Sequence, residues 1–187
     1  MKKSKILAGL SVVILGLFSY SCSEVPVTVE QPPIGQAQQE VTKSYVESLD
    51  PPYTVGMKYT YAVSNSATPN LAPEISSTEV LEVIDDSIKV RLTSSTRGTE
   101  ERAGKIADFS SGLPETGIIS EGTEDITVPA GEYKGAIKVS CFVSMGEEGS
   151  PKTKTTIWLV KDIGAIKRVD ILPNTNIITT ELKEFKK

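Results

Sequence analysis

Hydrophobic and polar residues alternate along most of the chain after Tyr53. The clearest run is SIKVRLTSS, residues 87–95, which places Ile88, Val90 and Leu92 on one side of a strand and polar side chains on the other. Other short runs, each bounded by Gly, Pro, Asp or Asn, occupy residues 57–64, 78–86, 124–128, 132–143, 153–160, 164–170 and 177–185. The pattern predicts an all-β domain.

The segments between the runs carry turn residues, which favours antiparallel pairing. Asp85 and Asp86 separate two runs and predict a β-hairpin. Many short strands with frequent turns are typical of an antiparallel sheet that is curved into a half-open barrel, or closed into a barrel or sandwich. Residues 98–120 are ambiguous, and no segment after Leu49 has a helical period.

Residues 22–52 have the composition of a tether. They are rich in Pro, Gln, Glu and Ser and have no sustained period, although a short helix between Gln36 and Ser48 is compatible with the pattern. A random coil of this length spans roughly 30 Å, enough to clear lipid head groups. Pro52 marks the predicted boundary, so that residues 53–187 form a single β-rich domain.

Residues 1–21 have the three parts of an export signal peptide. Three lysines precede an apolar stretch from Ile6 to Phe18, and small residues follow it. A helix of that length measures roughly 20 Å, which is shorter than the ~30 Å hydrocarbon core, so a permanent membrane span is disfavoured. We expect this segment to be removed.

Cys22 follows the signal directly, in the tetrad Ser19-Tyr20-Ser21-Cys22. The tetrad resembles the lipoprotein box of bacterial lipoproteins. The resemblance implies that Cys22 becomes the mature N-terminus and is the lipid attachment site, with diacylglycerol on its thiol and an acyl chain such as palmitate on its amino group. Each buried CH₂ contributes about 0.8 kcal/mol, so two or three chains hold a protein on a membrane. An ordinary secretory cut after Ser21 is the alternative.

Cys141 is the other cysteine of the chain. An exported protein with two cysteines invites a disulfide, but a Cys22–Cys141 bridge needs the N-terminus folded back onto the domain. If Cys22 is lipidated, Cys141 has no partner. It shares the alternating face of Ile137, Val139 and Val143, so we expect a small buried apolar side chain and not a reactive thiol.

The mature chain is acidic. Without residues 1–21 it has 17 basic and 24 acidic side chains, and its formal net charge is −7 in place of −4. This charge disfavours nucleic acid as a partner, and it disfavours electrostatic binding to anionic lipid head groups. The remaining 166 residues suffice for one domain with its own core.

Two segments resemble a known family. Residues 124–139, EDITVPAGEYKGAIKV, and residues 156–169, TIWLVKDIGAIKRV, are similar to the repeating motif of β-rich bacterial envelope proteins that include the family catalogued as domain of unknown function 3108. The matching residues are Val128, Pro129, Ala130, Gly131, Tyr133, Trp158 and Gly164. The resemblance implies a half-open, β-barrel-like fold in the cell envelope and carries over no catalytic residue. Pro129 and Gly131 suit a tight turn, so the motif indicates fold and not function.

No motif of known enzyme chemistry is present. The chain has no histidine, which excludes His-activated nucleophiles, His general bases and the usual zinc sites. Phosphate-binding loops and the Ser-x-x-Lys and Gly-x-Ser-x-Gly motifs are also missing. We therefore expect no enzyme, no cofactor and no metal site. Four acidic pairs are the candidates for glycoside hydrolysis or Ca²⁺ binding: Asp85-Asp86, Glu100-Glu101, Glu124-Asp125 and Glu147-Glu148.

Two functions are compatible with this sequence. The first is a non-enzymatic, membrane-anchored module of the cell envelope that binds an envelope protein, a glycan or a lipid acyl chain. The second is a carboxylate-dependent glycan hydrolase, which needs two distant acids to converge in a cleft. A lipid on Cys22 implies the extracytoplasmic side of a membrane. Ser23, in place of the Asp that retains some lipoproteins at the inner membrane, favours the outer membrane and periplasm.

Overall fold

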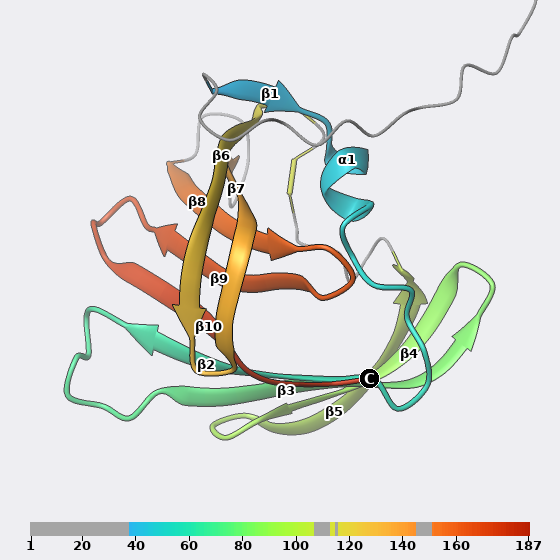
Figure 1. The fold of residues 1–187 in the computed structure, drawn as a ribbon. Coiled ribbons are helices and arrows are strands. Elements are labelled where there is room, and N and C mark those ends of the chain that lie inside the picture. Colours follow the sequence, from blue (N-terminus) through green and yellow to red (C-terminus); the bar gives the residue numbers. More distant parts are fainter. Residues whose placement is uncertain (1–37, 107–112, 115, 145–150) are drawn as a thin grey trace, which may run out of the picture. The chain divides into compact units, whose positions relative to one another are not determined.

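The computed structural model describes residues 38–106, 113–114, 116–144 and 151–187. These residues form ten strands and one short helix (Figure 1). In chain order the elements are β1 (Gln39–Val41), α1 (Lys43–Glu47), β2 (Lys58–Asn65), β3 (Glu74–Ile84), β4 (Ser87–Ser94), β5 (Gly98–Lys105), β6 (Ile118–Val128), β7 (Gly131–Ser144), β8 (Lys152–Val160), β9 (Gly164–Ile171) and β10 (Ile177–Lys186).

All the strands belong to one antiparallel sheet. Its order is β1-β6-β7-β8-β9-β10-β2-β3-β4-β5. Strands β2 to β5 and β6 to β10 are two meanders, joined where β10 pairs with β2. Strands β1 and β5 are the two edges and do not pair with each other, so the sheet is curved but open (Figure 1). The predicted all-β, half-open architecture is confirmed, and closure into a barrel is not observed.

The hairpin predicted at Asp85 and Asp86 is confirmed. Strand β3 ends at Ile84 and β4 begins at Ser87, and these two residues are paired. Asp85 has φ 51°, a left-handed conformation that Asp tolerates better than most residues. The local turn chemistry therefore determines the register of this strand pair.

The first turn of the second meander, between β6 and β7, contains residues of the sequence motif. Pro129 and Ala130 separate β6 from β7, and Gly131 takes φ 141° as its residue type allows. The Ala130 N–H donates to the Leu182 carbonyl at 2.9 Å, which joins the tip of this hairpin to β10. The structural interpretation of the motif is confirmed at this turn.

The fold begins earlier than the predicted boundary at Pro52. Strand β1 pairs with β6, and α1 follows at once with Thr42 as its N-cap, where the Thr42 hydroxyl accepts from the Tyr45 N–H at 3.2 Å. Val46 and Leu49 are only 1% and 6% exposed. This part of the predicted tether is therefore structured, because packing against the sheet stabilises a helix too short to be stable alone.

Buried apolar side chains form two clusters. One gathers residues of β2, β3, β4 and each strand from β6 to β10, and the other packs Val46 and Leu49 against β6, β7 and β8. Cys141 belongs to the second cluster and is 2% exposed. Burial raises the pKa of its thiol. The prediction of a buried apolar cysteine is confirmed.

Candidate functional site

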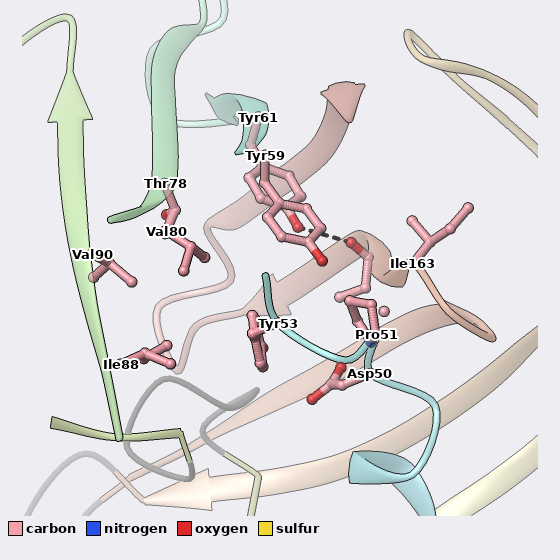
Figure 2. Close-up of a pocket in the computed structure, with 12 residues that line it drawn as sticks. Asp50, Pro51, Tyr53, Tyr59, Tyr61, Thr78, Val80, Ile88, Val90 and Ile163 are labelled. Carbon is pink, nitrogen blue, oxygen red and sulfur yellow. Dashed lines mark hydrogen bonds between the residues drawn. The ribbon is translucent and has the colours of Figure 1, made fainter. Parts of the chain in front are cut away.

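A cavity of about 220 Å³ lies between the sheet and the segment that follows α1 (Figure 2). Three neighbouring strands supply one wall, the segment that follows α1 a second, and the turn between β8 and β9 a third. The lining residues are Asp50, Pro51, Tyr53, Tyr59, Tyr61, Thr78, Val80, Ile88, Val90, Ile163, Gly164 and Ala165. Most of them are apolar or aromatic, which is typical of a site for a small molecule.

The sheet wall follows from strand alternation. Tyr59 and Tyr61 are two residues apart on β2, so their side chains project from the same face. Thr78 of β3 pairs with Tyr59, and Val80 of β3 pairs with Val90 of β4, which continues this face across three strands.

The two tyrosines of this wall are held by specific contacts. Their rings are stacked, with centroids 6.2 Å apart and planes at 5°. The Tyr61 hydroxyl donates to the Ala165 carbonyl at 3.0 Å, as the dashed line in Figure 2 marks, and the Tyr59 hydroxyl donates to the Met57 sulfur at 3.4 Å. Burial raises the pKa of both phenols, so both stay protonated at physiological pH.

The segment after α1 is fixed to the opposite side of the cavity. The Asp162 N–H donates to the Leu49 carbonyl at 3.1 Å, which joins this segment to the β8–β9 turn. Pro51 is buried, and Asp50 is half-buried beside it. Both Asp50 and Pro51 line the cavity (Figure 2).

Asp50 is the one carboxylate among the described residues that line the cavity. Within the described part of the chain, no ion pair or hydrogen bond to its side chain is found. Burial, and then the charge of Glu47, raise the pKa of Asp50 to about 6. Burial, followed by the charge of Asp50, likewise raises the pKa of Tyr53 to about 12. An ionised Asp50 is therefore an uncompensated negative charge at neutral pH.

The acidic pairs predicted as candidates lie elsewhere. Five of their described carboxylates contact basic side chains or the protein's own donors: Asp86 with Lys105, Glu100 with Arg102, Glu101 with Lys89 and Arg91, Glu124 with Lys138 and the Trp158 indole, and Asp125 with Lys134 and the Gly135 N–H. None of these described pairs lines the cavity, and Glu147-Glu148 lies outside the described residues. The sequence did not single out Asp50, because it falls in the predicted tether.

The motif residues serve the fold, with one exception. The ring of Trp158 lies 5.3 Å from the Lys138 ammonium and 5.8 Å from that of Lys167, and its N–H donates to Glu124. Gly164 is the exception, because it lines the cavity next to Asp50.

Further sequence predictions concern lipid attachment, metal binding and membrane spans. Cys22, the lipid attachment site, and the signal segment lie outside the described residues. In the described ranges, no three acidic or cysteine side chains gather closely enough to ligate a metal ion. None of the described segments forms a helix of the length and hydropathy needed to cross a lipid bilayer.

Comparison with known proteins identifies the fold. No family model matches the chain, and no curated protein matches it significantly. A protein from Bacteroides fragilis, proposed to be exported and described as having a YmcC-like fold, aligns with a TM-score of 0.53 and 11% identity, over 75% of this chain and 100% of that chain. The two chains share that fold. The likeness at this identity concerns the fold alone.

A second solved structure is also similar. It is a protein from Parabacteroides distasonis proposed to be a lipoprotein, and it aligns with a TM-score of 0.48 and 13% identity, over 73% of this chain and 97% of that chain. Because no family model matches, the resemblance to the family catalogued as domain of unknown function 3108 stays a prediction from the motif residues.

Proposed function

We propose that the protein is a lipid-anchored module of the bacterial cell envelope that binds a small apolar ligand and catalyses no reaction. Export is supported by the signal pattern of residues 1–21, by Cys22 in its lipoprotein box, and by the fold shared with a protein proposed to be exported. A binding role is supported by the lack of histidine and by the ion pairs of the described acidic pairs outside the cavity.

The cavity is the observation on which the binding role rests. An apolar cavity of about 150 Å³ is large enough to bind benzene. The cavity described here, at about 220 Å³, holds one ring or a short alkyl chain with a small polar group. It is too small for a whole diacyl lipid, so the ligand is a small molecule or the end of a single chain.

The test uses an apolar probe of suitable size. The full chain with Cys22→Ser is exported without lipid, so that no detergent competes for the cavity, and n-hexanol is titrated into it by ¹H–¹⁵N NMR. Saturable shifts of the Ile163, Gly164 and Ala165 amides are expected, because these residues line the cavity.

A matched pair of variants locates the binding. Thr78→Phe fills the cavity and should abolish the hexanol shifts, whereas Thr60→Phe adds the same ring to β2 on the face opposite Tyr59 and Tyr61 and should retain them. Shifts that survive in Thr78→Phe, or that are absent from the parent chain, would contradict the proposed function.

A further inference from the structure

The cavity has a polar side that the apolar probe does not use. Resting on the proposed function that the cavity binds a small apolar ligand, we propose that its ligand carries a primary ammonium group and that Asp50 is the residue that recognises this cation.

The described lining offers one negative charge and no positive charge. Asp50 is the only carboxylic acid among the described residues of the lining, and no Lys or Arg is among them. The described residues place neither an ion-pair partner nor a hydrogen-bond donor on its carboxylate. The Tyr53 hydroxyl, on the same wall, likewise has no hydrogen-bond partner among the described residues. Two polar groups without a partner among the described residues are thus available to a ligand in a mostly apolar and aromatic space.

Two further carboxylates lie near Asp50 in the described part of the chain. Glu47 of α1, which is itself paired with Lys43 at 3.8 Å, and Asp162 of the β8–β9 turn share a surface hollow with Asp50. Among the described residues, the remaining titratable groups that face it are three phenols, Tyr53, Tyr59 and Tyr61, which are neutral at physiological pH. This negative field favours a cationic ligand and opposes a carboxylate or a phosphate. It therefore disfavours fatty-acid anions and phospholipid head groups as occupants of this end.

The aromatic lining matches the same ligand class. Three tyrosines contribute to the cavity wall, and the faces of tyrosine rings attract ammonium ions. A carboxylate together with several aromatic rings is thus suited to an alkyl or aryl amine, with its apolar part against Val80, Ile88 and Val90 and its ammonium at Asp50.

The experiment compares three probes that share one chain length. n-Hexylamine, n-hexanol and n-hexanoate are titrated at pH 7.5 into the Cys22→Ser full chain, with the amides of residues 163–165 as reporters. A charge-assisted hydrogen bond is worth about twice a neutral one, so hexylamine should bind about tenfold more tightly than hexanol, and hexanoate should bind more weakly than either. In Asp50→Asn, hexylamine should fall to the affinity of hexanol, and hexanol should be unchanged.

Asp162→Asn is the matched control. It removes the same charge nearby, Asn also tolerates the positive φ of 64° at this position, and the residue lies outside the cavity lining. Hexylamine affinity should therefore change less than threefold in this variant.

A pH series adds a second readout. Alkylamines, like Lys with its pKa near 10.4, stay charged between pH 5 and 7.5, so any pH dependence reports on the protein. With the pKa of Asp50 at about 6, hexylamine should bind roughly fivefold more weakly at pH 5 than at pH 7.5, and the affinity for hexanol should not change.

The outcomes separate the two proposals. Equal affinity for hexylamine and hexanol, or full hexylamine affinity in Asp50→Asn, would overturn the inference and leave the apolar-ligand function in place. Failure of all three probes to shift the reporter amides would overturn the proposed function itself.

Discussion

The carboxylate of Asp50 lies where a side chain on Gly164 would begin. A Cβ built on Gly164 would lie 2.9 Å from the Asp50 Oδ1 and 3.5 Å from the Pro51 Cδ. Gly164 also has φ 83°, a conformation that other residues rarely adopt. The glycine therefore meets two demands, the turn into β9 and the close approach of the segment that carries the carboxylate.

Gly164→Ala should destabilise the protein and displace Asp50. We expect a loss of about 2–3 kcal/mol in the free energy of unfolding, of which about 1 kcal/mol is backbone strain and the rest is the clash. The measurement is urea unfolding. Gly98→Ala is the control, because Gly98 has the same φ of 83° and open space around its Cβ position. Equal losses of unfolding free energy in the two variants would show that the clash with Asp50 does not contribute to the destabilisation.

Asp50 should make stability depend on pH in a defined direction. Its pKa is raised to about 6, above the ~3.9 of an unfolded chain, so the folded state holds this proton more tightly. The protonated Asp50 therefore adds to the free energy of unfolding. This contribution is fully present below about pH 4 and is lost as the pH rises through 6. Each pKa unit corresponds to about 1.36 kcal/mol, reduced here by partial exposure.

The comparison with Asp50→Asn isolates this effect. The two proteins should be equally stable near pH 4, and the variant should be about 1–2.5 kcal/mol more stable at pH 7.5, by urea unfolding at each pH. Carboxylates with lowered pKa values, such as that of Glu121, which accepts from the Ser140 hydroxyl, affect both proteins equally and cancel. A difference that does not vary with pH would refute the raised pKa.

Val46 should be required for the stability of the whole domain. It is 1% exposed, and its truncation leaves a cavity in the core, so Val46→Ala should cost about 2 kcal/mol. Val55 lies nine residues later and is 65% exposed, so Val55→Ala should stay within about 0.5 kcal/mol of the parent. Thermal unfolding of both variants checks this, and equal midpoints would mean that α1 is peripheral.

Cys22 should determine where the protein is found. If it is lipidated, Cys22→Ser should move the chain from the membrane fraction to the soluble fraction on centrifugation, because only the acyl chains hold it there. Cys141→Ser should leave the distribution unchanged, since Cys141 is buried in the domain. A parent chain that is already soluble would favour the ordinary secretory cut.

The sequence predicted the parts of the fold that local chemistry determines. Asp85 and the Pro129–Gly131 turn both set hairpins within a few residues, and the alternation of β4 assigns its faces. Strand β5 was missed because its sequence, GTEERAGK, has no apolar alternation. Nearly all of its side chains are exposed, and β4 alone pairs with it.

The site could not be predicted in the same way. Asp50, Tyr59 and Gly164 come together through the curvature of the sheet and the path of the segment that follows α1. No spacing along the chain encodes this proximity. The sequence offered only adjacent acidic pairs, which alternate between faces in a strand or contact basic neighbours in turns. Asp50, the acid found in the described lining, has no adjacent acidic residue in the sequence and lies between Leu49 and Pro51.

The pairing of β10 with β2 determines when the two meanders can join into one sheet during folding. Lys186 pairs with Lys58 and Ile178 with Asn65, so β10 joins β2, the first long strand of the sheet. Until β10 is in place, each meander has an unpaired edge next to the gap, and contacts of such high sequence separation form slowly. The two meanders therefore become one sheet only when β10 pairs on both of its sides, and loss of residues 178–187 would divide the sheet in two.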